Sequence, residues 1–323
     1  MLKLVPFSQE HIPAALAIAR SRYEAERQYT PWLPHIGDFP DLRPFAQNGL
    51  GVAAFHGESL MGYLCGVPPF RHAFGSTDAV GVFSPIHANG AAGEHRGEVY
   101  ARMVQAAAEK WARAGAASHA VCLYAHDHEG QSQLFRYGYG LRCMDATRPA
   151  VPLNAPPCPG YTFRELAAEE LPLAYPLELE LDRHMAQSPT FILRPSQSPQ
   201  EFLQAARQEH SRIFAAFFGM QAVAYYKITE RSGETFLTDY PQTQHIHGAF
   251  CLPKHRGKGV AASLLDYVLQ VLQSEGVQNL GVDFESINPS ADRFWHKHFA
   301  VYTHSVTRRA DEHAVAALQS SSL

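Results

Sequence analysis

The chain has 323 residues, of which 46% are hydrophobic and 18% charged, and its formal net charge is −4. That composition is typical of a globular protein large enough for two hydrophobic cores. The sequence has no apolar run of the ~18 residues that a membrane-spanning helix needs, and it lacks the basic excess of a nucleic-acid-binding protein. We therefore expect no membrane span and no nucleic-acid partner.

The cysteines and the first residues bear on the compartment. Five cysteines are scattered along the chain without any C-x-x-C pair, which argues against a disulfide framework and a structural zinc site. The first residues lack the long apolar core of a signal peptide and instead fit a strand that runs into a capped helix. We expect a cytoplasmic protein.

Segments of the first half recur about 160 residues later. Residues 10–13 (EHIP) match residues 169–172 (EELP), and residues 53–57 (AAFHG) match residues 215–219 (AAFFG). A repeat of this period predicts two copies of one domain. We predict a first domain at residues 1–149 and a second at residues 161–323.

The boundary between the copies is rich in proline. Proline cannot continue a helix or a central strand, so its density at residues 150–160 predicts a short, stiff linker. The prolines concerned are Pro152, Pro156, Pro157 and Pro159, with Pro149 immediately before them.

The most informative segment lies in the second copy. The apolar residues 249–253 are followed by residues 256–261 (RGKGVA) and then by the amphipathic residues 262–272. This order predicts a strand, a glycine-rich turn and a helix. Such a turn presents unpaired backbone N–H groups and the positive end of the helix dipole, and glycine lets a phosphate approach them. We expect this turn to bind a diphosphate.

The spacing of the turn fits neither the G-x-G-x-x-G dinucleotide fingerprint nor Walker A. The pattern R-x-x-G-x-A, preceded by Leu-Pro, resembles the acyl-CoA motif of the GNAT superfamily of N-acetyltransferases. A predicted strand at residues 280–284 follows at the expected distance. Residues 288–295 (NPSADRFW) are then similar to the family's Asn-x-x-Ala-x-x-Phe-Tyr helix. An unrelated α/β domain with a glycine-rich turn is the alternative.

The resemblance implies an α/β (α+β) protein with two tandem GNAT acyl-CoA N-acyltransferase folds, each a mixed, mostly antiparallel sheet flanked by helices. It also implies acetyl-CoA as a co-substrate. In the family the pantetheine arm runs along the strand that here spans residues 245–252. The residues expected to bind it are Phe250, Cys251, Leu252, Arg256, Gly257, Lys258, Gly259, Val260, Ala261 and Asn288.

The first copy departs from the motif. Val99 stands in place of Gly259, and Glu98 replaces Lys258. A branched side chain would crowd a phosphate, and a carboxylate would repel it. His128 stands where the second copy has an asparagine. We therefore expect a degenerate first domain that keeps the fold and has lost acyl-CoA binding.

The resemblance also suggests catalytic residues. Some family members carry a glutamate near the start of the cofactor-binding strand, where this chain has His245 and His247, and histidine can accept a proton near neutral pH. Either is our candidate base, with Asp239, Glu285 and a chain of waters as competitors. The Cys251 N–H is the candidate donor to the tetrahedral oxyanion.

The proton donor to the departing thiolate is where the chain departs from the family. Trp295 occupies the position of the family's tyrosine, and an indole N–H can donate a hydrogen bond but cannot usefully give up its proton. Trp295 either orients the thiolate or belongs to the core. Tyr302 and Tyr240 are substitutes, and a thiolate can also leave unassisted.

Two histidine pairs raise the question of a metal. The His126–His128 pair and the His245–His247 pair each place alternate residues on one side of a strand, but no third ligand stands at a supporting spacing. We therefore expect no metal.

We predict an N-acetyltransferase that transfers the acetyl group of acetyl-CoA to a primary amine of a small molecule or peptide. Two alternatives stay open: a non-catalytic acyl-CoA-binding sensor with a GNAT fold, and a protein-interaction module that uses neither site. The sequence leaves open whether the protein is a monomer or a homodimer. The resemblance implies an acceptor pocket built by the first helices and by the loop between the sixth and seventh strands, and the sequence carries no motif there.

Overall fold

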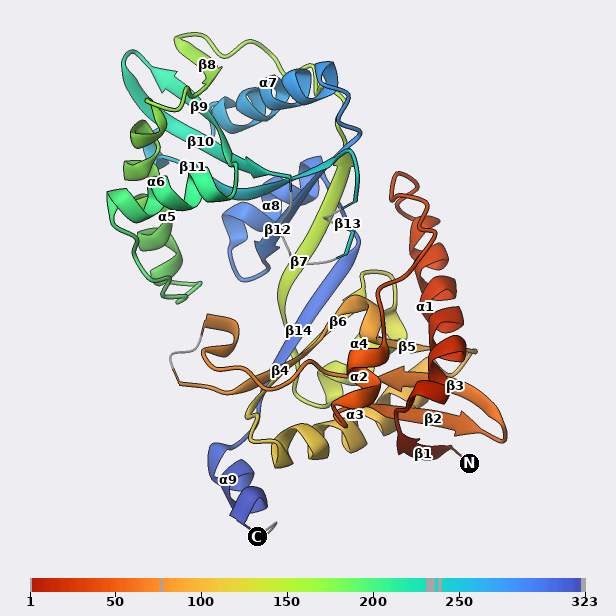
Figure 1. The fold of residues 1–323 in the computed structure, drawn as a ribbon. Coiled ribbons are helices and arrows are strands. Elements are labelled where there is room, and N and C mark those ends of the chain that lie inside the picture. The colour runs from red at the N-terminus through yellow and green to blue at the C-terminus, as the bar shows by residue number, and fades with distance from the viewer. Residues whose placement is uncertain (1, 76–77, 231–235, 238–239, 321–323) are drawn as a thin grey trace. The chain divides into compact units, whose positions relative to one another are not determined.

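The computed structural model describes residues 2–75, 78–230, 236–237 and 240–320. The chain forms two compact units, one of residues 1–144 with 301–323 and one of residues 145–300. Strand β14 (Thr303–Arg309) therefore belongs to the first unit although it comes near the end of the sequence (Figure 1). The boundaries predicted from the sequence, at residues 1–149, 150–160 and 161–323, stay a prediction about domains.

The first unit contains two groups of strands. One is an antiparallel sheet in the order β1-β2-β3-β5, and in the other β6 pairs in parallel with β4 and antiparallel with β14, which pairs antiparallel with the first part of β7. These strands are β1 (Lys3–Pro6), β2 (Val52–His56), β3 (Ser59–Leu64), β4 (Gly81–Ser84), β5 (Asn89–Ala91), β6 (Ser118–Tyr124) and β7 (Gly140–Pro149).

Helices α1 and α3 cover opposite faces of the β1-β2-β3-β5 sheet. Side chains alternate along β2, so Ala53 packs with α1 while Val52 and Ala54 pack with α3. The helices of this unit are α1 (Ile12–Arg27), α2 (Arg43–Gln47), α3 (Arg96–Arg113), α4 (His128–Arg136) and α9 (Glu312–Ser320).

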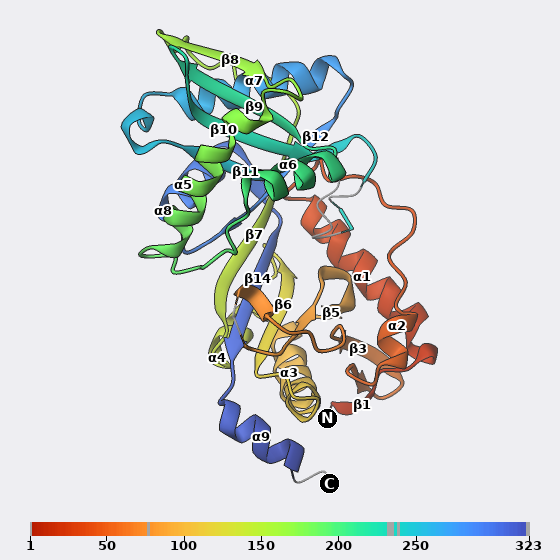
Figure 2. The same cartoon turned by 60° about the vertical axis from the view of Figure 1, so that its left-hand side comes forward.

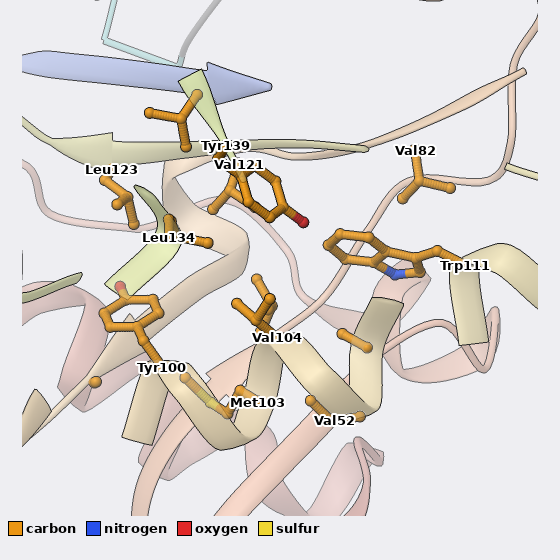
Figure 3. Close-up of a cluster of buried hydrophobic side chains, with 14 of the residues drawn as sticks. Val52, Val82, Tyr100, Met103, Val104, Trp111, Val121, Leu123, Leu134 and Tyr139 are labelled. Carbon is orange, nitrogen blue, oxygen red and sulfur yellow. The ribbon is translucent and has the colours of Figure 1, made fainter. Parts of the chain in front are cut away.

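The core of the first unit lies along α3 (Figure 3). Val99, Met103, Ala107 and Trp111 recur every four residues, which places them on one face of the helix, and all are buried. The indole N–H of Trp111 donates to the Leu50 carbonyl over 2.9 Å, so this polar atom is satisfied inside the core.

The second unit has a mixed sheet in which β12, β11, β10, β9 and β8 follow in this order, with the second part of β7 beside β12. Between β12 and β8, the β11–β12 pair is parallel and the other neighbours are antiparallel. Helices α5 and α6 lie on one face and α7 lies on the other (Figures 1 and 2). The prediction of a mixed, mostly antiparallel sheet flanked by helices is confirmed. The elements are β8 (Tyr161–Glu165), α5 (Tyr175–Ala186), α6 (Pro199–Gln208), β9 (Arg212–Phe218), β10 (Gln221–Thr229), β11 (Thr243–Cys251), α7 (Val260–Ser274), β12 (Asn279–Glu285) and α8 (Pro289–His298).

Local signals in the sequence explain where these helices begin. Ser198 and Glu201 form a capping box at α6, in which the Ser198 N–H donates to the Glu201 carboxylate over 2.7 Å. Asn288 caps α8, since its Oδ1 accepts the N–H of Ala291 over 3.4 Å.

The predicted linker is held to α7, because the Asp266 carboxylate accepts hydrogen bonds from the N–H groups of residues 153–155.

The two units repeat one arrangement of strands. In the second unit, the first part of β11 pairs in parallel with β12 and its last part pairs antiparallel with β10. In the first unit two separate strands make these pairings: β4 pairs in parallel with β6, and β5 pairs antiparallel with β3. A 3-10 turn at residues 86–88 separates β4 from β5. The internal repeat seen in the sequence is thus also present in the strand pairing.

None of the helices in the described parts of the chain is both long and apolar enough to cross a membrane.

Candidate functional site

Strands β11 and β12 separate part-way along their length. They pair from Thr243 with Asn279 to Ile246 with Val282, and no further pair is formed within these two described strands. β11 continues beside β10, and the register between them shifts at His247, which is an extra residue on the β11 side. The edge of β11 that faces β12 is therefore open from residue 247 onwards.

The register shows which backbone groups lie at this open edge. The Leu252 N–H donates to the Val223 carbonyl over 2.9 Å, so residue 252 is bonded toward β10. Because backbone groups alternate along an antiparallel strand, Cys251 and Ala249 direct their N–H and C=O groups away from β10. On the side away from β10, the Cys251 carbonyl accepts a hydrogen bond from Nε of Arg256 over 2.8 Å.

The turn after β11 requires glycine at two positions. Gly257 has φ of 73° and Gly259 has φ of 83°, in the left-handed region that other residues rarely adopt. A Cβ at either glycine would meet no atom within 4 Å, so backbone conformation, not crowding, selects glycine here. Gly259 is the N-cap of α7, whose first N–H groups point out of the helix end beside this turn.

A cavity of about 530 Å³ lies beside the turn and the open edge of β11. Its lining residues come from α5, β10, β11, the turn, the start of α7 and α8. They come from both faces of the sheet: Phe250 packs with the α5 and α6 side, whereas Tyr226 donates its hydroxyl to the Ala261 carbonyl on the α7 side over 3.0 Å.

The charged groups of the cavity are basic. Arg256 projects from the turn, and Arg293 and Lys297 from α8, whereas no aspartate or glutamate is among the described residues that line it. The Arg256 guanidinium lies over the Phe250 ring at 5.1 Å, which helps to hold it at the cavity wall. Together with the N-terminal end of α7, these groups favour an anionic ligand.

Most of the predicted cofactor-binding residues meet at this cavity. The lining includes Phe250, Cys251, Arg256, Gly257, Gly259, Val260, Ala261 and Asn288. Leu252 and Lys258 are not part of it. Lys258 is exposed, and its carbonyl accepts a hydrogen bond from the Cys158 thiol over 3.3 Å.

The two predicted base candidates lie outside the lining. His245 is buried, and its Nε2 is 2.9 Å from Oδ1 of Asp283. Although burial opposes ionisation, the hydrogen bond from His245 lowers the pKa of Asp283. His247 is exposed at the bulge, where partial desolvation and the Lys227 ammonium lower its pKa.

Of the competing bases, Asp239 lies outside the described residues, and Glu285 ends β12 without lining the cavity.

Trp295 does line the cavity. Only 5% of it is exposed, and its ring packs against Tyr226, Phe294 and Phe299 with centroid distances of 6.0, 4.9 and 5.3 Å. Both interpretations of Trp295, as a core residue and as a hydrogen-bond donor to the ligand, are compatible with this position. The substitutes Tyr240 and Tyr302 are not among the lining residues.

The sequence prediction missed several lining residues, among them His184 on α5, Tyr226 on β10, and Arg293 and Lys297 on α8. Burial and the neighbouring Cys251 thiol raise the pKa of Tyr226, so its hydroxyl stays protonated. The sequence offered no motif for Tyr226 or His184, which lie in a strand and a helix without any recognised pattern.

The corresponding position of the first unit is built differently. Helix α3 begins at Arg96, so residues 96–99 are helical and form no turn like that before α7. The sequence predicts that Val99 crowds a phosphate, but Val99 instead points into the core of the first unit. A Cβ added to Gly62 would lie 2.7 Å from the Cγ1 atom of Val99. Glu98 is exposed. Instead, Glu129 occupies the helix end and is 3.2 Å from Arg96.

Residues 180–300 match the model of the Acetyltransferase (GNAT) family. The second unit carries a GNAT domain. No curated protein matches the chain at a significant level. Among solved structures, the chain is similar to a GCN5-related N-acetyltransferase from Sphaerobacter thermophilus, with 15% identity, a TM-score of 0.54 and 95% of each chain covered. That similarity extends the fold of this family beyond the GNAT domain to nearly the whole chain.

Two further solved structures are less similar. A tandem GNAT protein from the clavulanic acid biosynthesis pathway has 13% identity, a TM-score of 0.43 and coverage of 96% of this chain and 99% of that chain. A GCN5-related N-acetyltransferase from Kribbella flavida has 12% identity, a TM-score of 0.40 and coverage of 96% and 71%.

Proposed function

We propose that the protein is an N-acetyltransferase that transfers the acetyl group of acetyl-CoA to a primary amine of a small molecule or peptide. The observation that carries this proposal is the cavity of the GNAT domain, which combines the open edge of β11, the N-terminal end of α7 and the basic side chains of Arg256, Arg293 and Lys297. Acetyl-CoA offers matching parts: a peptide-like pantetheine arm and several phosphates. One molecule would be the co-substrate of each chain.

The residues at the cavity suit the parts of this ligand. Its diphosphate would accept hydrogen bonds from the N–H groups at the start of α7 and from Arg256. The pantetheine amides would pair with the open backbone groups of Ala249 and with the Cys251 carbonyl, as an added strand would, which leaves the Cys251 N–H for the reacting carbonyl. Arg293 and Lys297 on α8 are then available for the remaining phosphate charge.

The protein can assist the reaction at three points: removal of a proton, stabilisation of the oxyanion and departure of the thiolate. A base must remove a proton from the ammonium group of the acceptor, since only the free amine has a lone pair to attack the thioester carbonyl. N–H donors must stabilise the oxyanion, and the Cys251 N–H is our candidate donor. Loss of one such donor lowers kcat by about 10²–10³-fold. The CoA thiolate then leaves, and Trp295 and Tyr226 line its expected surroundings.

The free state of all five cysteines fits a reducing compartment, which supports our proposal of a cytoplasmic enzyme.

The second candidate is a GNAT-fold protein that binds acyl-CoA as a sensor without turnover. The observation that favours it is Trp295, because an indole cannot supply the proton that the family's tyrosine supplies. In this case the same cavity would bind acetyl-CoA and no amine would be acetylated.

One experiment separates these candidates. Acetyl-CoA binding is measured by calorimetry, and release of free CoA thiol is measured with spermidine, tyramine, kanamycin and a short peptide with a free amino terminus. An acetyltransferase binds acetyl-CoA and releases thiol with at least one amine, with mass spectrometry showing the acetylated product. Binding without release above the hydrolysis background supports the sensor. Absence of binding contradicts both.

A further inference from the structure

His184 lines the cavity from the wall that α5 forms. It lies in α5 three residues after Leu181, so both side chains share one face of the helix, and both line the cavity. Leu181 belongs to the core cluster between α5, α6 and the sheet, which fixes this face of the helix against β11. The imidazole is half-buried, and its centroid is 6.0 Å from that of Phe250.

The hydrogen bonds of Asn288 determine the tautomer of His184. Oδ1 of Asn288 accepts the Ala291 N–H over 3.4 Å and the Ser290 hydroxyl over 2.8 Å, which identifies this atom as the amide oxygen. Nε2 of His184 lies 3.4 Å from the same oxygen. An oxygen cannot donate, so Nε2 carries the hydrogen and donates, and Nδ1 keeps its lone pair in the neutral ring.

Other ionisable groups of the cavity suit proton removal less well. Arg256, Arg293 and Lys297 are cations. Burial raises the pKa of the Cys251 thiol to about 11, so it is not a base near neutral pH. The other two histidines lie elsewhere on the wall: His255 follows β11 at the turn, where its Nδ1 is 2.9 Å from the Tyr161 hydroxyl, and His298 ends α8.

We propose that His184 is the general base of the acetyl transfer, a role that rests on the proposed function. Nδ1 of His184 takes one proton from the acceptor ammonium, and the freed amine nitrogen forms a bond to the thioester carbonyl carbon. The carbon–sulfur bond then breaks, and its electron pair leaves with the CoA sulfur. The nitrogen loses its second proton to the thiolate or to solvent, which completes an amide and free CoA.

The surroundings of α5 contain several other titratable groups, which the experiment must separate from His184. Glu178 and Asp182 on the same helix both bind Arg194. Further titratable or charged groups lie on the elements packed against α5 or line the same cavity. They are Glu170 before α5, Tyr225, Tyr226 and Lys227 on β10, His245, His247 and Cys251 on β11, His255 and Arg256 after β11, and Arg293, Lys297 and His298 on α8.

The test compares His184→Gln with His296→Gln in the full chain. Glutamine at 184 can still donate to Asn288 but has no basic nitrogen, whereas His296 is on α8 outside the cavity lining. The probes are acetyl-CoA and whichever amine of the panel supports the fastest thiol release. We expect kcat/KM of the wild type to rise between about pH 6 and 8, where imidazoles titrate.

His184→Gln is expected to lose this rising limb and about 10²–10⁴-fold in kcat, the usual contribution of a general base. Its Kd for acetyl-CoA stays within about twofold, and added imidazole restores part of the rate. A second acceptor with a less basic amine distinguishes titration of the enzyme from titration of the substrate. If the rising part of the profile reports an enzyme group, its midpoint stays at the same pH with both acceptors. His296→Gln keeps the wild-type profile.

Several outcomes would overturn this assignment. A His184→Gln enzyme that keeps the pH limb and more than a third of the rate excludes His184 as the base, while the proposed function stands. A limb that moves with the basicity of the amine also excludes it. A wild type that binds acetyl-CoA but acetylates no amine of the panel refutes both the base and the proposed enzyme.

Discussion

The backbone N–H of Gly97 donates to the Glu129 carboxylate over 3.3 Å, at the N-terminal end of α3 in the first unit. In the second unit the corresponding helix, α7, begins after a glycine turn, and its end faces the cavity. A carboxylate at the first helix end occupies N–H groups of the kind that a phosphate would otherwise bind. Glu129 is also held by Arg96, so the position is closed by an ion pair.

We therefore predict one acetyl-CoA per chain, bound in the second unit. Gly259→Val should lower the affinity at least 100-fold, because a branched residue at φ of 83° is strained and its side chain stands at the helix end. Gly276→Val is the matched control, since Gly276 has φ of 82° at the other end of α7. Calorimetry should give one site for the wild type and for the control. Two equivalent sites would contradict the prediction.

Val99→Ala should leave the number of binding sites at one. Val99 is buried in the first core, so the substitution removes apolar contacts without opening a phosphate site. We expect a loss of about 1–3 kcal/mol in the free energy of unfolding, measured by denaturant titration. A second acetyl-CoA bound by this variant would show that Val99 itself blocks a site.

Arg256→Ala should weaken acetyl-CoA binding about 10–100-fold, the value of a charge-assisted hydrogen bond to phosphate. Arg256→Lys keeps the charge but loses the bond from Nε to the Cys251 carbonyl, so its affinity should lie between those of the wild type and the alanine variant. Raising the salt concentration should reduce the affinity of the wild type more than that of Arg256→Ala. Equal affinities and salt slopes would show that Arg256 does not contact the ligand.

The His245–Asp283 pair should stabilise the second unit in a pH-dependent way. The hydrogen bond lowers the pKa of Asp283, against the effect of burial, so the pair contributes stability above the unfolded-state pKa of about 3.9. That contribution disappears as the pH falls through the lowered folded-state pKa. Asp283→Asn should therefore be less stable than the wild type at pH 7, and the difference should shrink toward pH 3. A difference that is constant with pH would show that the ionised Asp283 carboxylate is not the cause.

Some features of the site could be read from the sequence because they depend on neighbouring residues. The turn at residues 256–259 is marked by glycines that the backbone requires at positive φ, and the start of α8 is marked by its asparagine cap. The repeat of the two copies was also visible, since it requires only that matched residues recur at one spacing. Those predictions agree with the turn and helix positions in the structure.

Other features depend on residues far apart in the chain. The bulge at His247 arises because β11 pairs with two different strands, and the sequence of β11 alone does not show where it leaves β12. His184 reaches Asn288 only because α5 packs beside the start of α8, and the two residues are 104 positions apart. Glu129 closes the end of α3 from a distance of 32 positions. None of these contacts leaves a local pattern.

Trp295→Phe tests the remaining question of the leaving thiolate. The ring packs among Tyr226, Phe294 and Phe299, so we expect the substitution to cost about 1 kcal/mol or more of stability through imperfect repacking and to change kcat less than threefold. Trp111→Phe is the control in the first unit, where a buried Trp donates to a backbone carbonyl. It should destabilise the protein by about 1–3 kcal/mol without changing the kinetics of thiol release. A tenfold or larger fall in kcat for Trp295→Phe, with stability unchanged, would instead assign its indole N–H to the thiolate, because loss of one transition-state hydrogen bond has that effect.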